Sequence, residues 1–287
     1  MKTRVFTVCA FIFLFCGIVN AGINDGLVAY YPFNGNANDE SGNGNHGTVY
    51  GATLTTDRFG NINRSYSFNG KSDYIEVPDS LSLRGQDYLL SVSVWIKKNG
   101  DTQSIFTFIR KGISCSVPGW QIEINNNLAP DKLSFMAWDG KVDSWRITNI
   151  SPLNNNEWAH VVGTSNGNTA SLYVNGVIVG AKPVNHVLIG STWPLTIGAA
   201  KQACGYAQAF YQGSIADIRI YNRALSEAEI QQLYQGQGAC SSEVVKFTAG
   251  TPAKAADVNA NFDAHNCQIQ ALKAAFCQEH PTASLCP

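Results

Sequence analysis

Apolar and polar residues alternate along the chain from about residue 27 to residue 221, in short runs separated by Gly, Asn and Pro. A period of two predicts β-strands, because successive side chains of a strand point to opposite faces. Short strands at regular spacing favour a sandwich of antiparallel sheets over a parallel α/β sheet. The residues expected to point into the core of this sandwich are Val94, Ile96, Phe106, Ile122 and Phe135.

The pattern changes after the run 215–221, in which Ile215, Asp217, Arg219 and Tyr221 alternate with Ala216, Ile218 and Ile220. Ser226 follows, with Glu229 three residues later, which is the spacing of a helix capping box. Leu233 continues the helical spacing from Glu229. A strand that leads into a short helix is therefore expected here.

Two turns are also predicted. Asn175-Gly176 lies between apolar runs and is the strongest hairpin signal in the chain. Residues 163–167, Gly-Thr-Ser-Asn-Gly, match the pattern of a hydrolase nucleophile elbow, but that elbow requires a helix after the serine and a strand is expected instead. We interpret residues 163–167 as a hairpin turn.

The amino-terminal segment has the features of an export signal. Lys2 and Arg4 precede an apolar run from Val5 to Val19, and Val19-Asn20-Ala21 places small residues where signal peptidase cuts. We predict a signal peptide over residues 1–21, and the alternative is an uncleaved anchor. The protein is expected to be secreted or held at the cell surface, with the periplasm as another possible compartment.

The composition changes after Gly236, where we expect a linker over 237–250 and a helical tail over 251–287. Apolar positions in the tail alternate at spacings of four and three, as in a short coiled-coil seam. This seam predicts a homo-oligomer, and the alternative is a helix that folds onto its own domain. The seam positions are Val258, Phe262, His265, Ile269, Leu272 and Phe276.

The composition suits many short strands and excludes one class of ligand. The chain has 26 Gly and 10 Pro, with 11% aromatic and 14% charged residues. Without Lys2 and Arg4 of the leader, 18 basic and 21 acidic residues remain, a formal charge of −3. No basic stripe is present along the sequence, so a nucleic-acid ligand is not expected.

The mature chain has an even number of cysteines. In an exported protein this favours disulfides over free thiols or a metal site. The spacing alone does not choose between the possible connectivities. The six cysteines outside the leader are Cys115, Cys204, Cys240, Cys267, Cys277 and Cys286.

Three segments carry a resemblance to a known family. They are GLVAYYPFNGNANDESGNGNHG near the start, NEWAHVVGTSNGNTASLYVNGVIVG in the middle and GSIADIRIYNRALSEAEIQQLY near residue 213. In this order they resemble the laminin-G-like jelly-roll family of the concanavalin A-like lectin/glucanase superfamily, in its bacterial secreted form. The resemblance implies an all-β, two-sheet antiparallel jelly roll over residues 22–236 with its first and last strands side by side. It also favours a Cys115–Cys204 disulfide, with the other four cysteines paired inside the tail.

A loop after the first strand is a candidate calcium site. Oxygen-bearing side chains recur there at every second residue, and Ca²⁺ takes about six to eight oxygen ligands. The EF-hand pattern is incomplete because Tyr50 stands where a Glu is needed. The resemblance implies that Asp217 of the late strand completes the site, and the alternative is a polar loop held by its own hydrogen bonds. The predicted ligands are Asp39, Ser41, Asn43, Asn45 and Asp217.

The sequence does not favour catalysis. Glycosidases of the resembling superfamily carry Glu-x-Asp-x-Glu along one strand, which places two carboxylates on one face. Residues 121–125, Gln-Ile-Glu-Ile-Asn, are the nearest approximation and offer only Glu123. The five histidines show no zinc-binding spacing. His160, beside Trp158 in an expected strand, is interpreted as a satisfied structural residue.

Binding of a sugar requires less than catalysis, namely an exposed aromatic ring for the apolar face of a pyranose and a few polar groups for its hydroxyls. We therefore predict a non-catalytic exported module that binds carbohydrate or another cell-surface polymer. The alternatives are a structural unit of a surface or fibre-like protein and, less favoured, a glycoside hydrolase. Packing in the core or at its rim is the other explanation for these aromatic residues. The candidate ligand-binding residues are Trp138, Asp139, Trp145, Arg146, Trp193 and Tyr206.

Overall fold

The fold is taken from a computed structural model of the chain. It describes residues 22–84, 89–99, 105–114, 117–125, 132–138, 144–149, 153–184, 190–200 and 209–235. The predicted signal peptide, linker and helical tail lie outside the described residues, and so do the six cysteines of the mature chain. The domain boundaries, the disulfides and the homo-oligomer therefore stay predictions.

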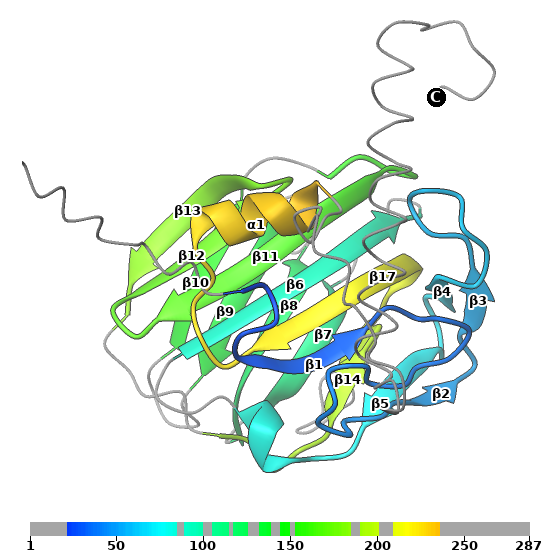
Figure 1. Cartoon of the computed structure of the whole chain (residues 1–287), viewed down its shortest axis with the longest axis horizontal. Coiled ribbons are helices and arrows are strands. Elements are labelled where there is room, and N and C mark those ends of the chain that lie inside the picture. Colours follow the sequence, from blue (N-terminus) through cyan, green and yellow to red (C-terminus); the bar gives the residue numbers. More distant parts are fainter. Residues whose placement is uncertain are drawn as a thin grey trace, which may run out of the picture.

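Two antiparallel sheets form the sandwich (Figure 1). The first has eight strands in the order β13-β12-β11-β6-β17-β4-β3, with β1 also paired to β17. Its strands are β1 (Leu27–Tyr31), β3 (Thr53–Thr55), β4 (Ser65–Asn69), β6 (Leu89–Lys98), β11 (Trp158–Asn166), β12 (Thr169–Val174), β13 (Val177–Pro183) and β17 (Gln212–Tyr221).

The second sheet has seven strands in the order β10-β9-β8-β7-β14-β5-β2. Its strands are β2 (Thr48–Tyr50), β5 (Tyr74–Val77), β7 (Ile105–Ser114), β8 (Val117–Asn125), β9 (Lys132–Trp138), β10 (Ser144–Asn149) and β14 (Leu195–Ile197). The remaining elements are the short pair β15 (Ala199–Ala200) and β16 (Ala209–Phe210), the 3-10 turn η1 (Leu81–Arg84) and the helix α1 (Glu227–Tyr234). This arrangement confirms the predicted all-β jelly-roll sandwich.

The core lies between the two sheets and is made of alternate residues of their strands. Val94, Ile96, Ile122 and Phe135 are each buried to 99% or more, as the alternation predicts. Phe106 is partly buried and packs against the same cluster. Burial of these apolar side chains supplies most of the favourable free energy that holds the sheets together.

The strands β1 and β17 are neighbours, as the resemblance implies, with Tyr31 opposite Ile218. The predicted alternation along β17 is wrong at one point. A β-bulge shifts the register between Ala216 and Arg219, and Asp217 takes a positive φ of 44°. The extra residue of the bulge allows Ile215 and Ile218 to face the core together. A continuous alternation places these two residues on opposite faces.

The strands β4 and β5 lie on either side of one short turn, and they belong to different sheets. β4 pairs with β17 in the eight-stranded sheet, whereas β5 pairs with β14 in the seven-stranded sheet. Asn69 holds the turn, because its Oδ1 accepts the backbone N–H groups of Lys71 and Ser72. This connection carries the chain from one layer of the sandwich to the other.

The helix α1 packs on the outer face of the eight-stranded sheet. Ser226 and Glu229 form the predicted capping box. Ile230 and Leu233 pack in a separate small apolar cluster with residues of the sheet below. The Asn175-Gly176 hairpin is also confirmed, and the Nε2 of Gln231 donates to the carbonyl oxygen of Gly176 at 2.8 Å. Residues 163–166 lie in β11 and a strand follows their turn, which confirms the hairpin interpretation.

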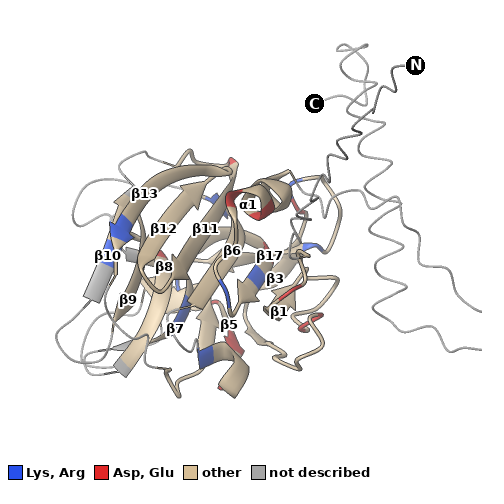
Figure 2. Ribbon diagram, turned by 60° about the vertical axis from the view of Figure 1, so that its left-hand side comes forward, with Lys and Arg blue, Asp and Glu red and all other residues tan. Residues whose placement is uncertain are grey.

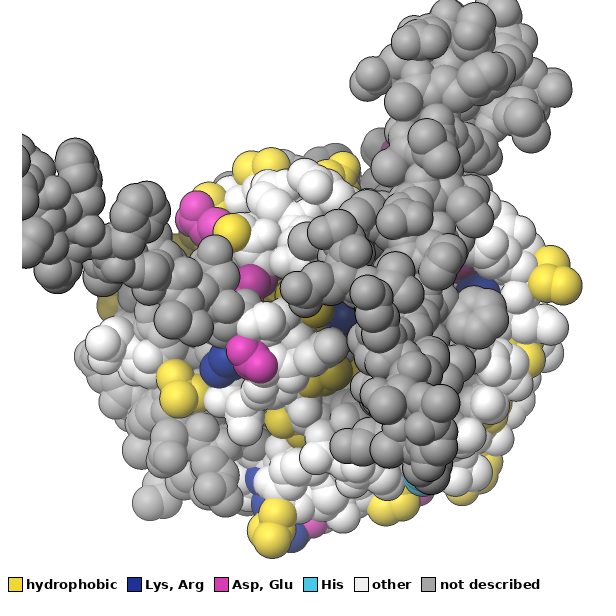
Figure 3. Space-filling view, in the orientation of Figure 1, with side chains coloured by type: hydrophobic (Ala, Val, Ile, Leu, Met, Phe, Trp, Pro, Cys, Tyr) yellow, Lys and Arg dark blue, Asp and Glu magenta, His cyan; other side chains and the backbone are white. Residues whose placement is uncertain are grey.

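Charged residues are spread over the described surface. Lys, Arg, Asp and Glu are scattered over both sheets in Figure 2, and the face that carries α1 shows separate charged side chains among uncharged ones (Figure 3). Among the described residues, no helix combines the length and the apolar composition needed to cross a bilayer.

Candidate functional site

The outer face of the seven-stranded sheet carries a continuous cross-strand row of mostly polar side chains. The register places one residue of each strand in this row, and alternate residues of the same strands enter the core. We call it the outer row. Its members, from β10 to β2, are Arg146, Met136, Gln121, Arg110, Thr196, Glu76 and Thr48.

Glu123 lies beside the outer row on β8 and is 2% exposed. Its Oε1 pairs with the Nη2 of Arg146 at 3.0 Å, and its Oε2 accepts the Nε2 of Gln121 at 2.6 Å. Burial raises the pKa of the Glu123 carboxyl, and the charges of Arg146 and Arg110 oppose that rise. Burial also lowers the pKa of Arg110 to about 10, against the attraction of Glu123. The face therefore holds a desolvated carboxylate between two guanidinium groups.

Three buried polar atoms on this face have no hydrogen-bond partner. They are the Oε1 of Gln121, the Oγ1 of Thr107 and the Nε1 of Trp138. Thr107 is opposite Glu123 in the register, and Trp138 follows the row residue Met136 by two positions. Buried polar atoms are nearly always paired, because an unpaired one costs about 1–3 kcal/mol. An acceptor, a hydroxyl and a donor without partners thus lie on one sheet face.

The indole of Trp138 has small neighbours along the sheet. Its cross-strand partner on β8 is Gly119, which is opposite Gly112 of β7. Neither glycine places a side chain next to the indole. At Gly112, with φ of 69°, an added Cβ would come within 2.1 Å of the carbonyl oxygen of Pro118 and 2.4 Å of the Oγ of Ser191. Gly112, which lies two strands away from Trp138, must therefore be glycine.

Trp193 precedes β14 and lies toward the end of the sheet where Gly112 and Trp138 are found. This follows from the register, in which Leu195 is opposite Lys111 and β14 runs antiparallel to β7. Two side chains bind the backbone of Trp193. The Nζ of the fully buried Lys111 donates to the carbonyl oxygen of Trp193, and the Oγ of Ser191 accepts its N–H at 3.1 Å.

The structure brings together two of the predicted ligand-binding residues, Trp138 and Arg146, on adjacent strands of one face. Trp145 is opposite Ala137 in β10, and its side chain is not described. Asp139 and Tyr206 lie outside the described residues. Sequence reasoning did not select Thr107, Arg110, Gln121 or Met136 for binding, and it weighed Glu123 only for catalysis. The available signal was the alternation of Gln121 and Glu123 with the apolar residues Trp120, Ile122 and Ile124.

The side chains predicted to bind calcium have partners within the protein. The Oδ1 of Asp39 accepts the N–H groups of Tyr30 and Ser41 at 2.9 Å each, and its Oδ2 accepts that of Asn45 at 2.9 Å. The Nδ2 of Asn43 donates to the carbonyl oxygen of Leu27 at 3.0 Å. These bonds tie the loop to β1 and to its own backbone.

Asp217 is not joined to that loop by any contact described here. Its carboxylate pairs with Arg58 at 3.4 Å and with the Nε of Arg219 at 3.1 Å. Within the described ranges, no cluster of three or more His, Cys, Asp or Glu side chains is arranged to hold a metal ion. The loop and Asp217 are thus held by separate contacts, and the hydrogen bonds of the loop are those expected for the alternative, a self-bonded polar turn.

Calcium binding stays a prediction, and thermal melting measures it directly. An ion that binds only the folded state raises the melting temperature by mass action. A calcium-binding chain is expected to melt higher in millimolar calcium than in excess chelator, with magnesium as the control ion. Equal melting temperatures in all three solutions contradict calcium binding.

A second polar cluster lies on the opposite face of the sandwich, next to α1. The rings of Trp95, His160 and Tyr234 are nearly parallel, with centroids 5.0 to 6.1 Å apart. The Nε2 of His160 is 2.8 Å from the Oγ of Ser93, but its Nδ1 is buried without a partner. The structural interpretation of His160 thus holds for one ring nitrogen only. Burial lowers the pKa of His160 to about 3.

The fold of two antiparallel sheets is that of the lectin-like jelly rolls. The family described as the concanavalin A-like lectin/glucanases superfamily matches residues 69–231, more than half of the chain. The chain belongs to this family. No curated protein matches the sequence.

Solved structures share the fold at low sequence identity. Domain 4 of AbnA, a GH43 extracellular arabinanase from Geobacillus stearothermophilus solved with arabinotriose, is 21% identical with a TM-score of 0.58, covering 73% of this chain and 98% of that domain. The receptor binding domain of a botulinum neurotoxin C/D mosaic serotype is 22% identical with a TM-score of 0.57, covering 78% of this chain and 54% of that one. A botulinum neurotoxin type C structure, described as dependent on two ganglioside molecules for cell entry, is 18% identical with a TM-score of 0.59, covering 75% and 52%. The chain thus spans about half the length of these toxin domains.

Proposed function

We propose that this protein is a non-catalytic, exported carbohydrate-binding module whose ligand lies on the outer face of β7, β8, β9 and β10. One observation carries the proposal, namely the grouping of three unpaired buried polar atoms, from Thr107, Gln121 and Trp138, on that face. A hydroxyl-rich ligand both donates and accepts hydrogen bonds, so it can satisfy an acceptor, a donor and a hydroxyl together. Such binding removes the cost of leaving these atoms unpaired.

The face carries charges of both signs. Glu123 pairs with Arg146, Glu76 lies farther along the outer row, and Lys132 of β9 lies on the same face. Basic side chains outnumber acidic ones there, so charge does not select a neutral polymer over an anionic one. The indole of Trp138 supplies the apolar surface on which a sugar ring stacks.

A bond-cleaving role is disfavoured by the carboxylates available. Glu123 is the only Asp or Glu among the described residues of β7, β8, β9 and β10. Both the retaining and the inverting glycosidase mechanisms use a pair of carboxylates about 5–10 Å apart. Glu123 instead pairs with Arg146, which suits it to positioning that guanidinium for binding.

The structural relatives support a binding role at the level of the fold. One carries arabinotriose, and another is described as depending on gangliosides. The match to the toxin covers only about half of that protein, so its ganglioside contact is not placed on the shared fold, and the low identity of both structures assigns no ligand to this chain. Their extracellular or toxin origin agrees with the proposed export.

Removing the side chains of this face tests the proposal. Trp138→Ala and Arg146→Gln are each expected to weaken binding to a neutral polysaccharide at least about tenfold, which is about 1.4 kcal/mol. The measurement is retention of the exported full chain on arabinan, xylan and β-glucan, followed by calorimetry on the retained polymer. Matched controls are Phe59→Ala and Arg64→Gln, at exposed positions in the connection between β3 and β4.

The controls should bind like the original protein. Absence of retention on every polymer, or equal retention of all four variants, contradicts a ligand site on this face. Release of new reducing ends from a polymer, abolished by Glu123→Gln, would favour the glycosidase alternative instead.

The assembly alternative depends on residues 251–287, which the structure does not describe. Sedimentation of the full chain against a chain that ends at Gly236 tests it. Identical monomers in both samples would exclude a homo-oligomer formed through the tail.

A further inference from the structure

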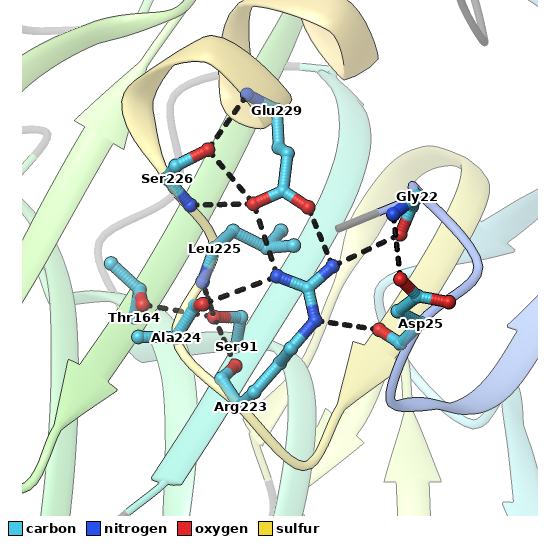
Figure 4. A network of polar contacts seen from close by, with 9 residues as sticks. All are labelled: Gly22, Asp25, Ser91, Thr164, Arg223, Ala224, Leu225, Ser226 and Glu229. Carbon is cyan, nitrogen blue, oxygen red and sulfur yellow. Dashed lines mark hydrogen bonds and ion pairs between the residues drawn. The ribbon is translucent and has the colours of Figure 1, made fainter. Parts of the chain in front are cut away.

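The first described residues are joined to the end of β17 by a single arginine (Figure 4). The Nε of Arg223 donates to the carbonyl oxygen of Asp25 at 2.6 Å, and its Nη2 donates to that of Gly22 at 3.2 Å. Ile23, between them, packs against the apolar cluster under α1. Residues 22–25 are thus part of the fold.

The same guanidinium is bound to the start of α1. Its Nη1 and Nη2 contact the two carboxylate oxygens of Glu229 at 3.0 and 2.5 Å. Glu229 also accepts the backbone N–H of Ser226 at 2.8 Å in the capping box. Arg223 therefore links the amino-terminal segment, the last strand and the helix, and bidentate pairs of this kind are among the stronger hydrogen-bonded contacts.

The backbone nitrogen of Gly22 takes part in this network. It donates to the Oδ2 of Asp25 at 2.6 Å, and both residues are exposed. An amide nitrogen at this place offers one neutral N–H. A free amino terminus here offers an ammonium with three N–H groups and a positive charge that faces a carboxylate.

The predicted cleavage site lies directly before Gly22, the residue whose nitrogen contacts Asp25. The small residues Val19-Asn20-Ala21 predict cleavage after Ala21, and Gly22 is the next residue. We propose that cleavage at the predicted Ala21–Gly22 bond creates an ammonium at Gly22 that forms an ion pair with Asp25, next to the Arg223–Glu229 pair. This inference is independent of the carbohydrate-binding proposal.

The proposed step is a hydrolysis that balances without a further reactant. Water adds across the Ala21–Gly22 amide, Ala21 leaves with the leader as a carboxylate, and the Gly22 nitrogen takes a proton to become an ammonium. The carboxylate of Asp25 then faces the ammonium and its backbone carbonyl accepts the Nε of Arg223, while Glu229 pairs with Arg223. Each positive group has a negative neighbour.

The ion pair gives the processed protein a dependence on pH that the precursor lacks. An α-amino group has an ordinary pKa of about 7.7–8.0, and an adjacent carboxylate raises it. The raised pKa means that the stabilisation is complete below about pH 7.7 and is lost as the pH rises through the folded-state value. Asp25, Arg223 and Glu229 are the charged groups that face the ammonium.

The first test is the mass of the exported full chain. Export from a bacterial host followed by intact-mass measurement is expected to give a protein that begins at Gly22. A protein that begins at any other residue, or that retains the leader, overturns the proposal.

The second test isolates the ammonium. A protease recognition sequence placed directly before Gly22 gives the same full chain with a blocked or a free Gly22 nitrogen. At pH 7 the free form is expected to melt about 1–3 °C higher, the shift of one exposed ion pair. The difference should vanish at pH 10 and in Asp25→Asn, whereas it should persist in the charge-matched control Glu40→Gln. Equal melting of free and blocked chains at pH 7 overturns the ion pair.

Discussion

Replacing Asp79 by alanine is expected to lower the free energy of unfolding by about 3–5 kcal/mol, because it leaves the Lys111 ammonium buried without an anion. Lys111 is fully buried, and its Nζ lies 2.5 Å from the Oδ1 of Asp79. Its other partner is the neutral carbonyl oxygen of Trp193. Burial lowers the pKa of Lys111, and the contact with Asp79 opposes this effect.

Chemical denaturation of three further variants identifies the source of the loss. Arg84→Gln removes the second, more exposed partner of Asp79 and should cost far less than Asp79→Ala, because solvent screens an exposed ion pair. Lys111→Met replaces the ammonium by an apolar group of similar length, so Asp79→Ala in that background should cost much less than it does alone. An equal cost of Asp79→Ala in both backgrounds would show that the buried charge is not the cause.

The Asp79–Lys111 pair is also in contact with the backbone near the candidate site. Lys111 holds the carbonyl oxygen of Trp193 at the end of the sheet where Trp138 lies. Lys111→Met keeps the apolar packing but releases that carbonyl. Polysaccharide retention by this variant therefore measures whether a fixed Trp193 backbone is needed for binding, separately from the stability of the fold.

The sequence predicted well those features that depend on local pattern. The strands follow from the period of two, and the start of α1 follows from the Ser226 and Glu229 spacing, because each depends on residues close together in the chain. The adjacency of β1 and β17 came from the family resemblance. No local signal joins residues about 190 positions apart, such as Tyr31 and Ile218.

The features missed depend on long-range register. In the sequence, residues 215–221 alternate without a break. The extra residue of the bulge at Asp217 is seen only when β17 is paired with β6. In the same way, nothing in the short turn after Asn69 shows that β4 and β5 enter different sheets. Both features stay hidden because the sequence pattern defines a strand but not its neighbour.

The side-chain contacts of the candidate site also depend on strand register, which the sequence pattern does not give. Trp138 and Arg146 were recognised by residue type, but the unpaired state of Gln121 and Thr107 exists only once strands β7, β8 and β9 are aligned. The calcium prediction likewise selected residues that carry oxygen. The spacing of Asp39 did not reveal that its carboxylate accepts backbone N–H groups of the same loop.

Acid should destabilise the protein through His160, by about 3–5 kcal/mol between pH 7 and pH 3. The ring is 1% exposed, and burial lowers its pKa to about 3 from an ordinary value near 6.5. A depressed pKa means that the neutral ring contributes its full stability above about pH 6.5, and that this stability is lost as the pH falls toward 3. Asp217 favours the protonated ring, whereas Arg58 and Arg219 oppose it.

A matched pair of variants separates this effect from other acid-sensitive groups. His160→Gln keeps a hydrogen-bonding group beside Ser93 but cannot take up a proton, so its loss of stability from pH 7 to pH 3.5 should be smaller by about 3–4 kcal/mol. His46→Gln keeps His160 and changes an exposed ring whose Nδ1 accepts the N–H of Asp39 at 3.1 Å, so it should lose clearly more stability in acid than His160→Gln. The carboxyl groups of Asp79 and Glu229, whose pKa values are lowered by their ion pairs, titrate in all three proteins and cancel in the comparison. An equal acid loss in His160→Gln and His46→Gln would mean that the ring is already charged at neutral pH or reaches solvent before the protein unfolds.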